Sequence, residues 1–292
     1  MQIVCKDLSF TFNKKSKFAS VALNGVSLNI SEGETVGIIG HTGSGKSTFI
    51  QHINRLIEVD EGFLQVGEFN LSPKTRKEKK KLKKSLIELR KKVGMVFQYP
   101  EYQLFAETVY ADCAFGVKKF YPELSEQEVA ERVKQALETL GMNYEEVKDL
   151  SPFELSGGQK RRVAIAGIIA TRPEILVLDE PLAGLDPVGK TALMDLIKKI
   201  KGDICKTVII VSHDMDEVCD NCDRVVVFSN GKIELDGTPK QVFSQGEKLK
   251  ELRLSCPVTA TLTQALKNKG VEIDNDFSLD GFVNAVAKAV KK

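Results

Sequence analysis

Eight consecutive residues combine glycines, hydroxyls and one lysine in a spacing suited to holding a nucleotide phosphate. They are Gly40, His41, Thr42, Gly43, Ser44, Gly45, Lys46 and Ser47. Glycines let backbone N–H groups turn inward toward an anion. Lys46 can then reach the β- and γ-phosphates, and the Ser47 hydroxyl can ligate Mg²⁺. The pattern predicts a P-loop that binds ATP with Mg²⁺, and its complete set of fixed positions disfavours a chance glycine-rich turn.

A pair of carboxylates, Asp179 and Glu180, directly follows the apolar run of residues 175–178. In open α/β sheets, ligands bind beyond the carboxyl ends of the strands. Asp179 is therefore expected to hold Mg²⁺, and Glu180 to accept a proton from an attacking water. The alternative is a plain strand followed by an exposed acidic turn, which the upstream P-loop disfavours.

These side chains need strands and helices to position them. The apolar run 36–39 predicts a buried strand before the P-loop, and residues 48–53 suit the first turns of a helix, with Thr48 at its start. The N-terminus of that helix adds a partial positive charge toward a phosphate. Further strands are expected at 93–97, before Gln98, and at 208–212, before His213.

The order of these motifs resembles that of the ATP-binding cassette (ABC) ATPases over about residues 1–235. Six elements match in sequence: the P-loop, Gln98, Leu155–Gln159, Asp179-Glu180, Gly184-Leu185-Asp186 and His213. The resemblance implies an α/β fold, with a RecA-like core, antiparallel β and helical subdomains, and a small, mostly helical C-terminal extension. We expect the ABC domain at 1–240, its helical subdomain at about 100–165, and the extension at 241–292.

In this family two cassettes face each other head to tail and clamp ATP between them. The resemblance implies that Glu180 is the general base and that His213 contacts the γ-phosphate. It implies that Gln98 meets the Mg²⁺ site and senses the transport partner, and that Asp186 organises the dimer interface. The residues expected to contact the partner's nucleotide are Ser156, Gly157, Gly158 and Gln159. They would offer a small hydroxyl and glycine N–H groups at the start of a helix.

Two positions depart from the family pattern. Phe12 is expected to stack on adenine where the family usually has Tyr; Phe10 competes for this role, because strand alternation puts both rings on one side. Leu182 stands where Thr or Ser is commoner and is expected to alter packing rather than chemistry. No catalytic position is degenerate, so hydrolysis is expected.

Residues 97–117 resemble the ATPases of energy-coupling factor (ECF) transporters, most of all the second member of their two-ATPase pair. The matching pattern is Phe-Gln-x-Pro-x-x-Gln-Leu-Phe, then Thr-Val, Asp and Ala-Phe-Gly. Segments 152–154 and 161–167, around the Leu-Ser-Gly-Gly-Gln motif, match as well. ECF systems import vitamins and transition metal ions.

The ECF resemblance implies a set of partners and a location. The partners are a second ABC ATPase (a paralogue or a second copy), a transmembrane coupling protein and a membrane substrate-binding protein. The surface around Gln98–Phe105 would receive the coupling helix; ordinary packing of the aromatic side chains there is the alternative. The chain would lie at the cytoplasmic face of the cell membrane as a peripheral subunit.

Composition agrees with one α/β domain plus a small appendage. The chain has 292 residues, 42% hydrophobic content and a formal charge of +2, which does not argue for nucleic acid. No apolar run approaches the roughly 20 residues needed to span a bilayer, and no secretory signal is visible. One cassette is present, so the partner ATPase is expected on another chain.

Three alternatives remain open: a closely related transporter ATPase and two proteins from other classes. An ATPase of a conventional importer is disfavoured by residues 97–117. A soluble ABC ATPase acting on nucleic acid or ribosomes usually has two cassettes or a long coiled-coil insertion. A non-hydrolysing regulatory module is disfavoured by the intact Glu180 and His213.

Two further features leave alternatives open. Cys219 and Cys222 have the spacing of a metal or redox pair, but no second pair or nearby His completes a site, so free thiols are favoured. Residues 74–92 contain eleven Lys or Arg and two Glu, a local charge of +9 that leaves −7 for the remainder. This segment predicts a solvated helix, a surface for anionic lipid, or a nucleic-acid contact.

The C-terminal extension is predicted to be helical. Cys256-Pro257 begins one helix with the stripe Val258, Leu262 and Leu266, which ends near Gly270. Ser278 is a predicted N-cap for a last helix, whose apolar positions are Leu279, Phe282, Val283, Val286 and Val290. That face is expected to pack on the cassette and to contact the partner ATPase.

Overall fold

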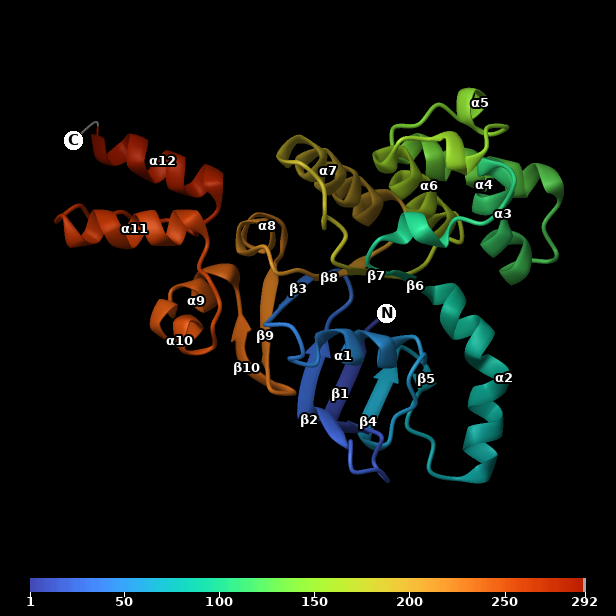
Figure 1. Cartoon of the computed structure of the whole chain (residues 1–292), viewed down its shortest axis with the longest axis horizontal. Coiled ribbons are helices and arrows are strands. Elements are labelled where there is room, and N and C mark those ends of the chain that lie inside the picture. The colour runs from blue at the N-terminus through green and yellow to red at the C-terminus, as the bar shows by residue number, and fades with distance from the viewer. Residues whose placement is uncertain (291–292) are drawn as a thin grey trace.

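The computed structural model describes residues 1–290, and two sheets organise the fold (Figure 1). The first is antiparallel, in the order β2-β1-β4-β5. Its strands are β1 (Ile3–Phe12), β2 (Ser20–Ile30), β4 (Glu61–Val66) and β5 (Phe69–Asn70). Phe12 is the last residue of β1 and therefore belongs to this sheet.

The second sheet has the order β10-β9-β3-β8-β7-β6 and is parallel except at its β10 edge. Its strands are β3 (Thr35–Ile39), β6 (Val93–Val96), β7 (Ile175–Asp179), β8 (Thr207–Val211), β9 (Arg224–Ser229) and β10 (Lys232–Gly237). The carboxyl ends of parallel strands meet at one edge, so the residues after β3, β6, β7 and β8 come together there. The predicted α/β fold is confirmed.

Alternation along the central strands divides the core into two layers. Leu176 and Leu178 of β7 face a cluster shared with the helices that cover one side of the sheet. Ile175 and Val177 face a cluster shared with α1 (Lys46–Ile53) and the antiparallel sheet. A strand buried on both faces reads as a continuous apolar run, which is why β7 is visible in the sequence.

A group of helices lies between β6 and β7, and the predicted helical subdomain at about 100–165 remains a prediction. The group comprises η1 (Pro100–Gln103), α3 (Val109–Phe120), α4 (Glu126–Thr139), α5 (Tyr144–Val147), η2 (Pro152–Glu154) and α6 (Gly157–Ile169). Helices α7 (Pro187–Asp203) and α8 (Met215–Asn221) follow β7 and β8. Buried Leu182, at 3% exposure, belongs to the core cluster beneath them, in agreement with a packing role.

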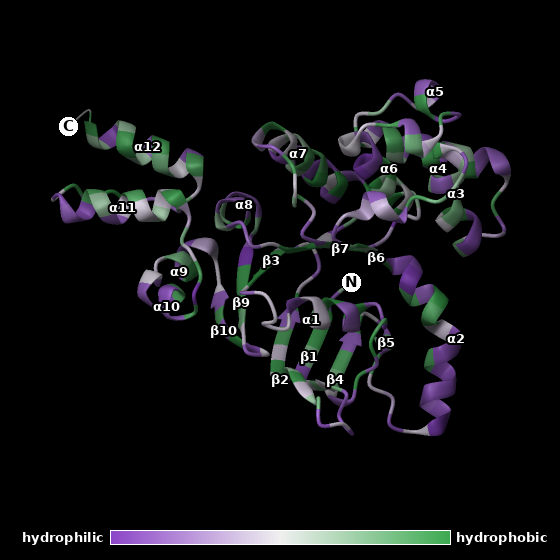
Figure 2. Ribbon diagram, viewed as in Figure 1, coloured by the Kyte–Doolittle hydropathy of each residue, from purple (hydrophilic) through white to green (hydrophobic). Residues whose placement is uncertain are grey.

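The basic segment forms α2 (Arg76–Lys92), which lies along one edge of the molecule and is largely hydrophilic (Figures 1 and 2). Thr75 and Glu78 form a reciprocal capping box at its start, and only Leu82 and Leu89 are buried. Within residues 1–290, the eight Lys and Arg side chains between Lys74 and Lys84 make no ion pair. The helix therefore exposes an ordered, uncompensated positive charge.

The segment after residue 240 divides into two parts. Helices α9 (Pro239–Phe243) and α10 (Gly246–Glu251) pack against the main sheet, with Phe243 and Leu249 in the core cluster of the cassette. Helices α11 (Val258–Asn268) and α12 (Leu279–Val290) form a hairpin that stands away from the body (Figure 1). The predicted boundary at 240 remains a prediction, and α9 and α10, which follow or span it, share the core of the cassette.

Two aspartates of α8 hold the hairpin. Asp216 Oδ1 accepts a hydrogen bond from Val258 N at 2.8 Å, and Asp220 Oδ1 accepts one from Leu279 N at 2.9 Å. Residues four apart lie on one face of a helix, so one face of α8 caps the first turn of both hairpin helices.

The apolar faces of the hairpin remain largely uncovered. Val258, Leu262, Leu279, Val283 and Val290 are all exposed. Among residues 1–290, no helix is long and apolar enough to cross a membrane. The exposed faces are therefore those of short amphipathic helices.

Candidate active site

A cleft of about 780 Å³ opens where the P-loop meets the ends of the central strands. Its wall includes the whole predicted phosphate loop, Gly40 to Thr48, together with Phe12, Gln98, Glu180 and His213. Asp179 lies directly behind Glu180, at 9% exposure. The structure thus brings together the residues predicted for the nucleotide of this chain.

Close backbone packing shapes the P-loop. Gly40 has φ +151°, and a Cβ there would lie 2.3 Å from the carbonyl oxygen of Phe228. Gly45 has φ +107°, and a Cβ there would lie 2.5 Å from the carbonyl oxygen of Ala22. These two positions accept only glycine, because any side chain would collide with fixed backbone atoms.

Lys46 is held inside this loop. Its ammonium donates to the carbonyl oxygens of Gly40 at 2.6 Å and His41 at 3.1 Å. Burial lowers the pKa of Lys46, against the attraction of the Glu180 and Asp179 carboxylates. A phosphate bound beside Lys46 would favour the charged form of its ammonium.

Ser47 and Asp179 are two of the three residues predicted to hold Mg²⁺, and Gln98 is the third. Burial raises the pKa of Asp179 above its usual range, while a hydrogen bond from the Ser47 side chain opposes that rise. Within residues 1–290, no three His, Cys, Asp or Glu side chains group as a metal site. Mg²⁺ in nucleotide sites takes one or two protein ligands plus phosphate oxygens, so one hydroxyl and one carboxylate fit it.

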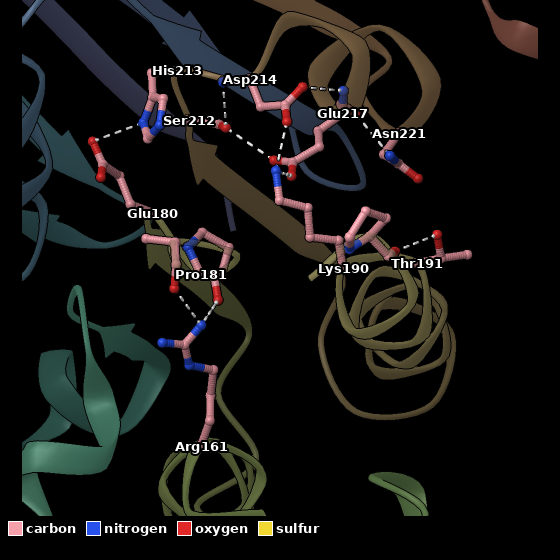
Figure 3. Close-up of polar contacts among 12 residues, drawn as sticks. Arg161, Glu180, Pro181, Lys190, Thr191, Ser212, His213, Asp214, Glu217 and Asn221 are labelled. Carbon is pink, nitrogen blue, oxygen red and sulfur yellow. Dashed lines mark hydrogen bonds and ion pairs between the residues drawn. The ribbon is translucent and has the colours of Figure 1, made fainter. Parts of the chain in front are cut away.

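Glu180 stands between Gln98 and His213. Its Oε2 accepts a hydrogen bond from Gln98 Nε2 at 2.8 Å, and its Oε1 lies 3.4 Å from His213 Nδ1 (Figure 3). The Glu180 backbone has φ +49° and its N–H donates to Val211 O at 2.8 Å. A non-glycine residue in this conformation is uncommon and is often found at functional sites. The arrangement holds the carboxylate at the mouth of the cleft.

Phe12 lines the cleft and is 42% exposed. Phe10 packs edge-on against Phe12, with 4.8 Å between ring centroids, and against His52 of α1 at 5.1 Å. The ring of Phe10 is therefore engaged in the wall, while the ring of Phe12 faces the cleft. This geometry favours Phe12 over Phe10 for stacking on a base.

The predicted partner-nucleotide residues lie outside this cleft. Ser156 caps α6, and it forms a reciprocal capping box with Gln159: Ser156 Oγ accepts from Gln159 N at 3.3 Å, and Gln159 Oε1 accepts from Ser156 N at 3.0 Å. Gly157 and Gly158 are exposed. Asp186 is also exposed, and its side chain caps α7 through Gly189 N at 2.7 Å.

Arg161 has a role that the sequence did not reveal. It is 4% exposed and makes a two-pronged ion pair with Glu101, at 3.1 and 2.8 Å. Its Nη1 also donates to the carbonyl oxygens of Pro181 and Ala183, the segment that follows Glu180 (Figure 3). Burial opposes ionisation of Glu101, but Arg161 holds the pKa of that carboxyl below its usual range. Arg161 thus joins the α6 helix to both neighbouring loops.

Other residues of the cleft were also missed. Residues 20–22 of β2 and Met215 of α8 line it, as do Arg253, Leu254 and Ser255 from the segment before α11. Only long-range folding brings these to the P-loop, and no local pattern marks them.

The cysteines are free thiols, and five of the six are buried. Burial raises the pKa of Cys219 to about 12, and burial also raises the pKa of Cys222. A thiol with so high a pKa stays protonated near neutral pH, whereas metal ligation and nucleophilic chemistry need the thiolate.

The fold and this cleft define a P-loop ATPase, with its phosphate-binding loop at the carboxyl edge of a mostly parallel sheet. A family model described as "ABC transporter" matches residues 23–183. The chain belongs to the ABC transporter ATPases and, within them, to the family of ATP-binding proteins of energy-coupling factor transporters.

Similar proteins and solved structures support this assignment to the family. The energy-coupling factor transporter ATP-binding protein EcfA2 of Caldanaerobacter subterraneus subsp. tengcongensis is 48% identical over 94% of this chain and 93% of its own. The protein of the same name from Clostridioides difficile is 45% identical over 100% and 98%. The structure of cbiO1 from Clostridium perfringens, part of the ABC transporter complex cbiONQ, has 35% identity and a TM-score of 0.73, covering 90% of this chain and 98% of its own.

A dimeric structure of MJ0796, a bacterial ABC transporter cassette, has 30% identity and a TM-score of 0.69, covering 81% of this chain and 98% of its own. A second structure of that cassette is a dimer bound to ADP and phosphate in a post-hydrolysis state. The prediction of an ABC ATPase of the ECF type is confirmed.

Proposed function

We propose that this chain is the ATP-hydrolysing subunit of an ECF-type importer, which drives uptake of a vitamin or a transition metal ion through a transmembrane coupling protein. The observation that carries the proposal is the Glu180 carboxylate, held between Gln98 and His213 beside a complete P-loop. The names of the relatives supply the transport context.

The hydrolysis step follows from the positions of these side chains. The P-loop N–H groups and Lys46 bind the phosphates of ATP. Glu180 removes a proton from a water whose oxygen attacks the γ-phosphorus, and the bond to the β-phosphate oxygen breaks to give ADP and phosphate. His213, next to Glu180, positions this water and contacts the γ-phosphate, and Phe12 stacks on the adenine.

Mg²⁺ would be held by Ser47 Oγ and the Asp179 carboxylate, with Gln98 at the edge of the same site. When bound, it would neutralise negative charge that develops on the phosphates during hydrolysis. The protein's part is to keep Asp179 ionised in a buried place, which the Ser47 hydrogen bond favours.

The signature residues Ser156, Gly157, Gly158 and Gln159 would serve the nucleotide of a second ABC ATPase, with Asp186 at the interface. The dimeric structures of MJ0796 support a paired arrangement. The partner is either a second copy or a paralogue. The hairpin α11–α12, with its uncovered apolar faces, would add to this dimer contact.

The surface around Gln98–Phe105 would receive the transmembrane coupling protein. Tyr102 and Phe105 are 84% and 61% exposed, and Phe105 packs edge-on with exposed Phe115. Exposed apolar groups gathered in this way mark interaction surfaces. A membrane substrate-binding protein would complete the assembly, with this chain peripheral at the cytoplasmic face of the membrane.

The test is to tag this chain in its native cell, solubilise the membranes gently and identify what copurifies. We expect a second cassette ATPase together with small integral membrane proteins. Recovery alone in the soluble fraction, or with ribosomes or nucleic acid, would overturn the transporter assignment. The substrate-binding protein recovered would identify the cargo.

A further inference from the structure

A network of charged side chains joins the helix after Asp186 to the loop that carries His213. Lys190 of α7 donates to Asp214 Oδ2 at 2.8 Å and lies 3.2 Å from Glu217 Oε1 (Figure 3). The Lys190 backbone N–H donates to Asp186 O at 2.9 Å, so the lysine belongs to the first turn that Asp186 caps. One side chain therefore connects the segment that begins at Asp186 to the loop that carries His213.

The network reaches the backbone on both sides of His213. Ser212 Oγ donates to Glu217 Oε2 at 3.1 Å and accepts from Asp214 N at 3.0 Å. Asp214 Oδ1 in turn accepts from Glu217 N at 3.3 Å as the cap of α8. The residue before His213 and the residue after it are thus both fixed by groups that Lys190 holds.

Lys190 is the charge on which this network depends. The side chains of Lys190 and Asp214 are about one-third exposed and that of Glu217 is 14% exposed. The Glu217 oxygen facing Lys190 has no hydrogen bond from any described residue, so the ion pair is its compensation. Burial and the neighbouring Asp214 charge raise the pKa of Glu217, while Asp214 and Glu217 raise that of Lys190.

We propose that Lys190 is a positioning residue for hydrolysis, which couples the location of Asp186 to the orientation of His213 against Glu180. The side chain of His213 is 69% exposed, and its one polar contact with residues 1–290 is the 3.4 Å approach to Glu180. Its placement must therefore come from the backbone of 212–214, which this network anchors. The inference rests on the proposed roles of His213 and Asp186, and it assigns to one lysine the link between partner contact and the reacting phosphate.

The alternative is that Lys190 only neutralises two carboxylates for stability. Breaking a partly buried pair leaves an uncompensated charge, so loss of stability alone cannot separate the two roles. Kinetics can, because a positioning residue affects kcat while leaving nucleotide affinity nearly unchanged. Small misplacements of catalytic groups cost up to about 10²-fold in rate.

The test uses the complex purified through a tag on the full chain, with Lys190→Met, Lys190→Arg and the double variant Lys190→Met/Glu217→Gln. Lys198→Met is the matched control: it makes the same change on the same helix, and Lys198 makes no ion pair within residues 1–290. Thermal unfolding, binding of a fluorescent ATP analogue, and kcat and KM for ATP are measured for each.

We expect Lys190→Met to lower kcat about 10-fold or more, with analogue binding and KM changed less than about 2-fold. Lys190→Arg should restore most of the rate, and Lys198→Met should match the wild type. The double variant should regain thermal stability without regaining kcat.

Recovery of kcat together with stability in the double variant would show that Lys190 only balances charge, and an unchanged kcat in Lys190→Met would equally overturn the proposal. A wild-type complex that hydrolyses no ATP would instead count against the proposed function. The two failures are therefore distinguishable.

Discussion

The P-loop and the signature segment Ser156–Gln159 each present N–H groups at the start of a helix, but their glycines have different surroundings. A Cβ on Gly40 or Gly45 would collide with backbone oxygens of this chain, at 2.3 and 2.5 Å. A Cβ on Gly157 or Gly158 would meet no atom of the described residues within 4 Å. The first pair of glycines is needed by the fold itself, whereas the second pair is not.

We call the P-loop side and the signature side the two half-sites for a nucleotide. The first is completed by residues of this chain, whereas the second is not. The P-loop side contains the cation, the carboxylates and the aromatic ring, all from one chain. The signature side offers a capped helix start whose glycines approach no other atom of residues 1–290 within 4 Å of an added Cβ. Glycines that their own chain does not require are explained by the close approach of another molecule, which supports the proposed pairing of two cassettes.

The largest expected effect tests whether catalysis belongs to the P-loop side. Glu180→Gln keeps the size of the side chain and its neighbours but removes the group that accepts the proton. We expect turnover to fall by about 10²–10⁴-fold, because that is the contribution of a general base. ATP should remain bound, as measured by nucleotide retention on the purified complex. Normal hydrolysis would show that another group is the base.

The next effect tests the signature side. Ser156→Asp keeps an excellent helix cap, so thermal stability should not fall. Its carboxylate would stand where the partner's γ-phosphate is proposed to bind, so turnover of the complex should fall by about 10²-fold or more. Binding of a fluorescent ATP analogue to the isolated chain should stay unchanged. Full activity would break the comparison, because Ser156 would then be only a cap.

A smaller effect concerns the base rather than the phosphates. Phe12→Ala should weaken ATP affinity roughly 10-fold, from about 1–2 kcal/mol of lost stacking. Phe12→Tyr, which keeps the ring, is the matched control and should bind as the wild type does. Titration with a fluorescent nucleotide measures both. Equal affinity in all three proteins would remove Phe12 from the site.

The smallest effect is expected away from both half-sites. The Met1 ammonium and the Lys206 side chain contact Glu32, and hydrogen bonds from Lys206 and the N-terminus lower the pKa of Glu32 to about 2. A carboxyl whose folded pKa is depressed adds stability above its unfolded pKa of about 4.5, and loses it as pH falls toward 2. Glu32→Gln should therefore be slightly less stable than wild type at pH 7, with the gap closing below about pH 4.5. Urea unfolding measures it, and ATP turnover should not change.

Local motifs and strand order predicted most of the active site. Gln98, the adjacent pair Asp179 and Glu180, and His213 are far apart in sequence, yet each of these three sites follows an apolar run, and the ends of parallel strands converge. The ABC fold followed from the same pattern. What escaped prediction depends on tertiary packing: Arg253 reaches the cleft from a distant turn, and nothing in its neighbours marks it.

The roles of Gln159 and Arg161 also required the structure. Both lie in or beside the signature motif, but the sequence cannot tell a side chain that folds back on its own helix from one that points outward. The side chain of Gln159 accepts a hydrogen bond from Ser156 N. The guanidinium of Arg161 pairs with Glu101 and donates to two backbone carbonyl oxygens. Helix capping and buried ion pairs depend on rotamers and long-range partners, which residue type alone does not fix.

The two aspartates of α8 that cap α11 and α12 give the hairpin the mechanics of a lever. Its twelve-residue helix α12 is about 18 Å long, and its base is fixed to the helix that begins two residues after His213. A tilt of α8 by about ten degrees would carry the far end of α12 through roughly 3 Å, on the helical rise of 1.5 Å per residue. A small adjustment of the helix that follows His213 would thereby be magnified at the far end of α12.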